Sequence, residues 1–466
     1  MIKIDSNTWR LGEGTSNYSN DRGFSPLSSK INIDRRGREG ILSPNGTSSS
    51  AGTFSSIWPL AVAQKALYGP YVFFGATGND LKVYTTSGSA LTDTGKSDNG
   101  RDYEPGITHA IKYNGKIYVT STTDIAYDID AETPDYDWWT TVPGEGQAAL
   151  TTSVPHLLLI VSGVLLISNG NKIEYWDGTN AGTILTLQDT DQIITSWCLH
   201  NDNVYFTTTN RLGDIDGNSY LHIWDGRNVN NVLIAKDIPL ANECLHIQSF
   251  QGELFLFFEH FLASYNGIKF QRLKTINWAS ASTPDYLTAI KEDRFYFVDN
   301  PNTTSSCIIA YRDGIFYKFY SSPDIRLLFG YISSWLNFLT SSSQYYMAHY
   351  NHSSNGVWYS NWYELGGNHK ITRVLVEFAE AVADGETNTL RIYNQKLSKQ
   401  ESEEPDNYIE LNCNYSSVKG MSNYVKEFRD LNFFVSSFQV AFDTFDTSVK
   451  SITIEYERTN QPIAKY

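Results

Sequence analysis

Cysteine is scarce in this chain, with four residues among 466. Cys198, Cys244, Cys307 and Cys413 lie far apart and have no C-x-x-C or Cys/His spacing of the kind that binds zinc. Cys198 and Cys244 have apolar neighbours in strand-like runs, an environment typical of buried free thiols. The sequence therefore predicts free thiols rather than disulfides.

Long apolar runs are also missing. The longest, residues 156–167, is about half the length of a membrane span and is interrupted by Ser162-Gly163. The first six residues, Met-Ile-Lys-Ile-Asp-Ser, lack the basic and then apolar pattern of a secretory signal. We expect a protein that is made in a cytoplasm, stays soluble and has no membrane partner.

Basic residues are in deficit, with 36 Lys and Arg against 51 Asp and Glu, a net charge of −15. Such a balance argues against a protein that grips nucleic acid by its phosphates. It is compatible with a surface past which DNA slides without adhering.

Between residues 69 and 367, no stretch of 12 or more residues has the apolar spacing of an amphipathic helix, whereas aromatic residues make up 14% of the chain. What is present is a recurring turn, in which an aromatic residue is followed by Asp-Gly or Asn-Gly. We interpret each copy as a two-residue hairpin turn. The turns end at Gly88, Ala131, Gly178, Gly226, Gly267, Gly314 and Gly356, in steps of 43, 47, 48, 41, 47 and 42 residues.

A second signal runs in phase with the first. Before most of these turns, a polar or glycine turn opens a short apolar strand. These strands are residues 116–119, 164–167, 204–207, 253–258 and 294–298. A repeat of roughly 40 to 50 residues with four strands per unit is typical of a β-propeller. The predicted fold is all-β, a propeller of about seven blades, with six as the alternative.

Three regions are predicted: an N-terminal arm (1–50), the propeller (51–367) and a β-sandwich (368–466). The arm contains two strand candidates, 29–33 and 40–43, around the basic Arg35-Arg36-Gly37-Arg38. It either closes the propeller ring with a strand or orders on a partner, and both alternatives stay open. Residues 58–67 are compatible with a short helix or with the first inner strand.

The sandwich is predicted from strands at 371–379, 389–393, 408–411, 432–442 and 449–457. The acidic loop 396–407 between them is interpreted as a solvated tip.

Catalytic groupings are not legible in the sequence. The nine histidines are scattered, only His349 and His352 are close together, and the common hydrolase, nucleotide and metalloprotease motifs do not occur. We predict no enzyme, no catalytic residues, no cofactor and no bound metal.

Two groups of acidic residues are candidate cation sites. Asp214, Asp216 and Asn218 alternate as in a calcium loop, with Asp225 at the twelfth place, but Ser219 stands where that loop requires glycine. A polar loop is the preferred interpretation. The other group is expected to be a solvated rim, and its members are Asp128, Asp130, Glu132, Asp135 and Asp137.

In layout, the chain resembles the tail nozzle or tail hub proteins of short-tailed bacteriophages, the group that includes packaged-DNA stabilisation proteins. The resemblance covers most of the chain and carries over no functional residue. It rests on the length, on Gly-Ile-Leu-Ser-Pro (40–44), on the units 169–178 and 310–319, and on a C-terminal sandwich that opens at 370–378 and ends at 452–457.

The resemblance implies a structural protein of the virion tail, made in the host cytoplasm. It implies a homo-oligomeric ring, a hexamer, below the portal and adaptor proteins and beside a tail fibre or tailspike. Such a ring retains the packaged genome and lets DNA leave through an acidic lumen without specific binding. The alternative is a glycan- or receptor-binding propeller that uses Trp358, Tyr359, Trp362 and Tyr363 as an aromatic platform.

Overall fold

The fold is known from a computed structural model of the chain. It describes residues 1–4, 31–34, 41–44, 46–53, 58–64, 71–87, 90–129, 131–141, 148–210, 212, 219–225, 233–234, 240, 242–279, 281–291, 294–312, 315–330, 335–341, 343–352, 356–379, 381–394, 408–418, 421–445, 447 and 449–459. Within them, strands dominate, and the helical elements are α2 (Trp138–Thr141) and η2 (Pro284–Tyr286). The predicted all-β class is confirmed. No helix of this part of the chain is long and apolar enough to span a membrane.

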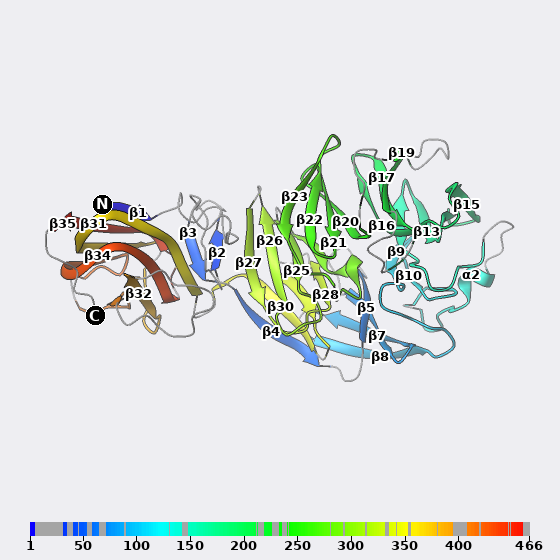
Figure 1. Ribbon diagram of the computed structural model, residues 1–466. Helices are drawn as coiled ribbons and strands as arrows, with labels where there is room; N and C mark the ends of the chain where they lie inside the picture. The colour runs from blue at the N-terminus through cyan, green and yellow to red at the C-terminus, as the bar shows by residue number, and fades with distance from the viewer. Residues whose placement is uncertain are drawn as a thin grey trace. The chain divides into compact units, whose positions relative to one another are not determined.

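Seven small antiparallel sheets follow one another along the chain (Figure 1). In sheet order, their strands are β5 (Trp58–Gln64), β6 (Tyr71–Thr77), β7 (Asp80–Ser87) and β8 (Ala90–Asp98); β9 (Ala110–Tyr113), β10 (Lys116–Thr120) and β11 (Ile125–Tyr127); β12 (Leu158–Val161), β13 (Val164–Asn169), β14 (Lys172–Trp176) and β15 (Ala181–Thr186); β16 (Ile193–His200), β17 (Asn203–Thr209), β18 (Ser219–Trp224) and β19 (Leu233–Ile234); β20 (Cys244–Phe250), β21 (Glu253–Phe258), β22 (Phe261–Tyr265) and β23 (Phe270–Thr275); β24 (Thr288–Lys291), β25 (Arg294–Asp299), β26 (Cys307–Arg312) and β27 (Ile315–Ser321); β28 (Leu327–Gly330), β29 (Trp335–Leu339), β30 (Ser343–His352) and β4 (Gly46–Thr53). This is the number of units that the turn repeat predicts.

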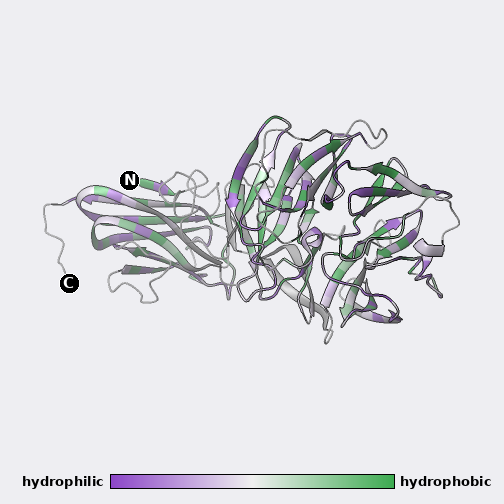
Figure 2. Ribbon diagram, turned by 45° about the vertical axis from the view of Figure 1, so that its right-hand side comes forward, coloured by the Kyte–Doolittle hydropathy of each residue, from purple (hydrophilic) through white to green (hydrophobic). Residues whose placement is uncertain are grey.

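The first strands of the small sheets contact one another in an order that the blades of a propeller would have, and we call them the inner strands. First strands lie against each other from β5 to β9, β12, β16 and β20 in turn, and from β24 to β28. β28 then lies against β5, so the last sheet of the series returns to the first. The five predicted apolar strands are all second strands, β10, β13, β17, β21 and β25. They are almost entirely buried. Figure 2 shows hydrophobic stretches along many strands of the protein.

In four of the small sheets, a two-residue turn joins the first and second strands. Asn114 and Gly115 have φ angles of 47° and 81°, and three further pairs share this left-handed conformation at both central positions, as a type I′ turn requires. These pairs are Ser162-Gly163, Asn201-Asp202 and Gln251-Gly252.

The Asp177-Gly178 and Asn266-Gly267 turns join third and fourth strands instead, and at these two places the predicted two-residue turn is wrong. Gly178 does have a positive φ of 100°, but the loop has four residues. Its geometry is set by Asp177, whose Oδ1 accepts the backbone N–H groups of Thr179 and Asn180, both at 2.7 Å. Asn266 acts in the same way before Gly267. Gly88, Gly226 and Gly314 lie outside the described residues. The strand bounds leave two residues between β7 and β8 and two between β26 and β27, as the prediction requires, but eight between β18 and β19. Gly356 begins β31 of the C-terminal sheet and does not join two strands of a small sheet.

The last small sheet takes its fourth strand from the N-terminal end of the chain. β4 pairs with β30 at the position that a strand following β30 would occupy. Of the two open alternatives for residues 58–67, the structure has the strand, β5. The predicted strands 29–33 and 40–43 also exist, as β2 (Ile31–Asp34) and β3 (Ile41–Pro44), but they pair with each other and join the C-terminal sheet.

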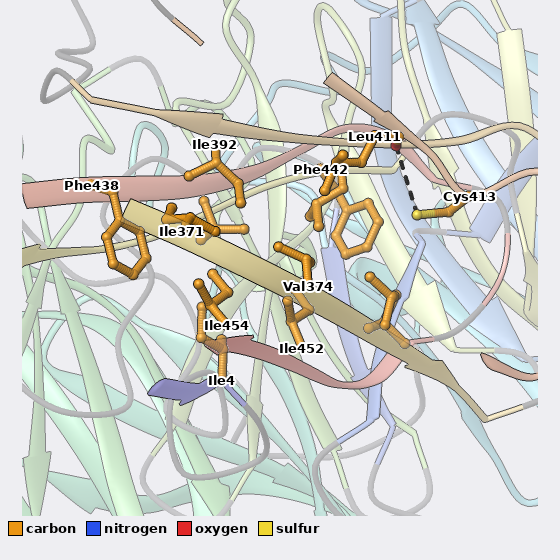
Figure 3. Packing of buried hydrophobic residues seen from close by; sticks show 14 of the residues in the cluster. Ile4, Ile371, Val374, Ile392, Leu411, Cys413, Phe438, Phe442, Ile452 and Ile454 are labelled. Carbon is orange, nitrogen blue, oxygen red and sulfur yellow. Dashed lines mark hydrogen bonds between the residues drawn. The ribbon is translucent and has the colours of Figure 1, made fainter. Parts of the chain in front are cut away.

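One eight-stranded sheet makes up the C-terminal part of the chain. Besides β2 and β3, its strands are β1 (Ile2–Ile4), β31 (Gly356–Phe378), β32 (Asn388–Tyr393), β33 (Tyr408–Asn412), β34 (Val425–Phe445) and β35 (Val449–Arg458). β31 and β34 are long, and their register shifts several times along the pair. Side chains from β32 and from β35, at separate places in the sheet, pack into one apolar cluster (Figure 3). The sheet thus encloses a single core, as the two sheets of a sandwich do. Unlike in a sandwich of two separate sheets, hydrogen bonds connect all of its strands.

The strand β31 runs through residue 367, where the sequence predicts a domain boundary. Gly366 and Gly367 have positive φ angles of 69° and 143°, so the glycines bend the strand without ending it. Residues 356–364 pair with β34 and belong to the C-terminal sheet. The chain divides into two compact units, Met1–Thr47, Ile308–Ser321 and Ala348–Tyr466 in one and Ser48–Cys307 and Ser322–Met347 in the other. We call the first the C-terminal unit and the second the propeller-like unit.

Candidate functional site

The connection between β23 and β24 contains a cluster of polar side chains that contact several inner strands. We call residues 282–288 the hub segment. The hydroxyl of Thr283 donates to the backbone oxygen of Arg326 at 2.8 Å, next to β28. On another side, the Tyr286 hydroxyl accepts the N–H of Ala110 in β9 at 2.8 Å. The segment thereby ties together sheets that are far apart in the sequence.

A histidine and a carboxylate form the centre of this cluster. Nδ1 of His246, on β20, lies 2.8 Å from Oδ1 of Asp285 in η2. Its Nε2 lies 3.0 Å from the Thr288 hydroxyl at the start of β24. The hydroxyl of Ser196, on β16, donates to Asp285 at 3.3 Å and accepts the N–H of Ile247 at 3.0 Å. Three inner strands are therefore held by one buried network.

Serine, histidine and aspartate occur together here, but their geometry differs from that of a hydrolase triad. In a triad the carboxylate holds one ring nitrogen and the serine uses the other. Here both Asp285 and Ser196 face Nδ1 of His246, with Ser196 at 3.4 Å, while Thr288 occupies Nε2. His246 is also 5% exposed, so its ring has little access to solvent. The arrangement suits cross-linking of strands rather than activation of a nucleophile.

His109 lies against the hub segment and stays neutral at physiological pH. Its ring is 5.2 Å from that of Tyr286, and its Nδ1 accepts the N–H of Leu158 at 3.3 Å. Burial lowers the pKa of His109 to about 4; the charge of Asp285 opposes this shift, whereas His246 adds to it. Burial also raises the pKa of Tyr286 well above its usual value, so its hydroxyl remains protonated.

A second buried histidine, His222, is expected to make the stability of the fold depend on pH. Burial lowers the pKa of His222 to about 4, and its ring stacks on Phe206 with centroids 4.7 Å apart. The pKa of His222 in the folded state lies below its value of about 6.5 in the unfolded state. Its contribution to the free energy of unfolding is therefore fully present above pH 6.5 and is lost as the pH drops towards 4. We expect His222 to account for a loss of about 2 kcal/mol between pH 7 and pH 5.

Urea unfolding at both pH values, compared with His222→Gln, measures this contribution. The variant should lose less stability on acidification than the natural chain. Equal pH dependence in the two proteins would show that His222 is not held neutral.

The residues weighed as cation sites do not come together in the described part of the chain. Asp128 pairs with Lys116 at 3.0 Å, and Asp137 pairs with Arg101. No group of three or more His, Cys, Asp or Glu side chains among the described residues has the arrangement of a metal site. Residues 213–218, with Asp214, Asp216 and Asn218, and the acidic loop 395–407 lie outside the described residues.

The four cysteines are free thiols, as predicted, and Cys244, Cys307 and Cys413 are buried. Of the aromatic platform considered for glycan binding, Tyr363 is partly buried against the core of the C-terminal sheet, with its ring 5.3 Å from that of Phe438. The side chains of Trp358, Tyr359 and Trp362, and those of His349 and His352, lie outside the description.

Sequence reasoning missed the hub segment. Its hydrogen-bond partners lie on β9, β16 and β20, so no local spacing connects them with residues 282–288. The one local signal is Ser-Thr-Pro-Asp-Tyr at 282–286, in which proline favours the first turn of a short helix. Nothing in that signal identifies the partners of Asp285.

Comparison with known proteins gives a likeness of structure alone. No protein-family model and no curated protein matches the chain. Among solved structures, the extracellular domain of a hybrid two-component system from B. thetaiotaomicron has a TM-score of 0.49 at 10% identity, covering 94% of this chain and 62% of that one. Chaetomium thermophilum Raptor has a TM-score of 0.45 at 13% identity, covering 76% and 31%. The β-propeller domain of Myceliophteria thermophila Cps50 (Swd1) has a TM-score of 0.44 at 7% identity, covering 64% and 99%. At these values the likenesses carry no inference about function.

Proposed function

We propose that the protein is a structural subunit of a bacteriophage tail, in a nozzle or hub ring below the portal and adaptor proteins. In this role it retains the packaged genome and forms part of the channel through which DNA leaves. The proposal follows from the layout resemblance of the sequence to tail nozzle proteins. It is supported by an all-β fold in two units and by the acidic balance of the chain.

The observation that carries the proposal is how the N-terminal residues are used. β1, β2 and β3 join the C-terminal sheet, and β4 completes the last sheet of the propeller-like series. β3 ends at Pro44 and β4 begins at Gly46, so one residue separates strands of the two sheets. Main-chain pairing of this kind resists pulling better than loops do, which suits a protein that withstands the pressure of packaged DNA.

The hub segment supports a channel between subunits rather than within one. It contacts β20, β24 and β28 and hydrogen-bonds to β9, so polar side chains occupy the space among the inner strands. DNA would need a lumen that several subunits surround, as a ring of six would provide. At −15 per subunit, such a lumen would repel phosphates and let DNA slide.

Electron microscopy of the purified protein and of phage particles tests the proposal. We expect rings of the protein, and its presence at the tail vertex by mass spectrometry of particles. The purified protein should not retain duplex DNA at physiological salt. A chain that stays monomeric and is absent from every particle would contradict the proposal, and selective hits on a glycan array would favour the receptor-binding alternative.

A further inference from the structure

Side-chain hydrogen bonds join the sheet of β9 to β11 with the sheet of β12 to β15. The hydroxyl of Tyr113, at the end of β9, donates to the backbone oxygen of Gly163 at 2.8 Å. The N–H of Leu158, the first residue of β12, donates to Nδ1 of His109 at 3.3 Å. A tyrosine hydroxyl keeps its proton in mild acid, whereas an imidazole gains one. The bond to His109 is therefore the one that acid can break.

The bond from Leu158 requires one protonation state of His109. A neutral imidazole has one nitrogen that accepts a hydrogen bond and one that donates, whereas the protonated ring donates from both. Because Nδ1 of His109 accepts the N–H of Leu158, the proton of the neutral ring lies on Nε2. A second proton would place two N–H groups face to face and break the bond.

The hub segment offers the protonated ring of His109 another partner. Tyr286 packs against this ring, and the charges that act on it are those of Asp285 and His246. In the described part of the chain, the hydrogen bonds that reach the Asp285 carboxylate come from Ser196 and His246, and both end on Oδ1. Oδ2 can therefore accept a charged imidazole, which the negative charge of Asp285 attracts and a charge on His246 repels.

The main chain of His109 is anchored independently of its ring. Its N–H donates to the hydroxyl of Thr120, on β10, at 2.7 Å, and the N–H of Thr120 donates to the oxygen of His109 at 2.9 Å. Neither Thr120 nor Leu158 titrates, so protonation changes none of these anchoring bonds. His109 is also partly exposed, so protons reach its ring. The ring can thus exchange one partner for another while the backbone stays in place.

We propose that His109 is a proton-operated latch between β9 and β12. The neutral ring holds the N–H of Leu158, and the protonated ring releases it and pairs with Oδ2 of Asp285. Acid then loosens the contact between these two sheets before the rest of the propeller-like unit unfolds. The latch does not depend on the proposed function, so either can fail without the other.

Hydrogen exchange, measured by mass spectrometry on the full-length chain at pH 7 and pH 5, tests the latch. Labelling times are corrected for the effect of pH on intrinsic exchange. The pKa of His109 is about 4 in the closed latch and about 6.5 in an open one, so the bond is complete above pH 6.5 and is lost as the pH falls towards 4. We expect opening at Leu158 to increase about twentyfold from pH 7 to pH 5. The N–H of Leu187, which donates to the oxygen of Asn171 in the same unit, is the reference and should change little.

Three variants separate the latch from a merely structural role of His109. His109→Gln keeps an acceptor for Leu158 that takes up no proton, so the ratio of opening at pH 5 to opening at pH 7 should fall to about one. Asp285→Asn removes the charge that attracts the protonated ring, so the ratio should fall severalfold. His200→Gln is the matched control, because His200 is also buried but bonds to the Ser249 hydroxyl, at 2.8 Å, between β16 and β20. It should leave the ratio at Leu158 unchanged.

The outcomes that overturn the latch are specific. A ratio in His109→Gln equal to that of the natural chain would overturn it, and an unchanged ratio in Asp285→Asn would overturn the pairing with that carboxylate. If His109→Gln does not fold, the natural chain decides alone: an equal increase in opening at Leu158 and Leu187 sinks the proposal. So does an NMR titration in which the ring of His109 has its ordinary pKa of about 6.5.

Discussion

Removing residues 1–53 should abolish the cooperative unfolding of both compact units. The truncation removes β1, β2 and β3 from the C-terminal sheet and β4 from the sheet that ends the propeller-like series. Ile4 of β1 is fully buried in the core of the C-terminal sheet. Its loss alone costs about 1.5 to 3 kcal/mol, and the unpaired main chain adds to that cost. Against a typical domain stability of about 5 to 15 kcal/mol, we expect most of the stability to be lost.

A shorter truncation separates the two effects. Removing residues 1–44 deletes β1 to β3 but retains β4 and its pairing with β30. Differential scanning calorimetry should show a weakened transition of the C-terminal unit and a preserved transition of the propeller-like unit. Removal of residues 460–466, which deletes none of the described strands, is the control. If the chain lacking residues 1–53 unfolds like the natural chain, the N-terminal strands are not part of either core.

The repeated units were predictable because their signals are local. A left-handed pair such as Asn114-Gly115 and the apolar strand after it lie within ten residues. The residue types in the turn favour its backbone conformation, and the apolar residues of the strand predict its burial. The Asp177-Gly178 turn shows the limit of this reasoning. Its glycine was recognised, but the side-chain acceptor that lengthens the loop to four residues was not.

The pairing of strands that lie far apart in the chain was the feature least predictable from the sequence. The sequence predicts the strands β2 and β3, but nothing in residues 31–44 indicates that they join the C-terminal sheet. The sequence predicts a boundary at Gly366-Gly367 because the pattern of turns and strands changes after it. In the structure the pair bends β31, and continuous pairing with β34 on both sides compensates for its flexibility.

The same limit applies to the network around the hub segment, in which Asp285 of η2 is connected with side chains from three different sheets. His246, Asp285, Ser196 and Thr288 are unremarkable in the sequence, and each forms part of the site only because the inner strands converge. A buried polar network of this kind is stabilising only when every member has a partner. Its integrity is therefore open to a direct test.

Asp285→Ala should destabilise the propeller-like unit by about 3 kcal/mol. The substitution removes one member of a hydrogen-bonded network and leaves the polar groups of its partners without an acceptor. The variant removes the acceptor of both His246 and Ser196. Asp285→Asn keeps an acceptor oxygen and should cost about 1 kcal/mol. Urea unfolding at pH 7 measures both, with the midpoint of the propeller-like transition as the readout.

The control for this test is Asp191→Ala, which removes an exposed carboxylate from the loop before β16 and should change stability by less than about 0.5 kcal/mol. The transition of the C-terminal unit serves as an internal reference, because all partners of Asp285 belong to the propeller-like unit. Equal midpoints for Asp285→Ala and Asp191→Ala would contradict the role of the hub segment as the cross-link among inner strands. A loss confined to Asp285→Ala, with partial recovery in Asp285→Asn, would establish that the carboxylate oxygen holds β16 and β20 together.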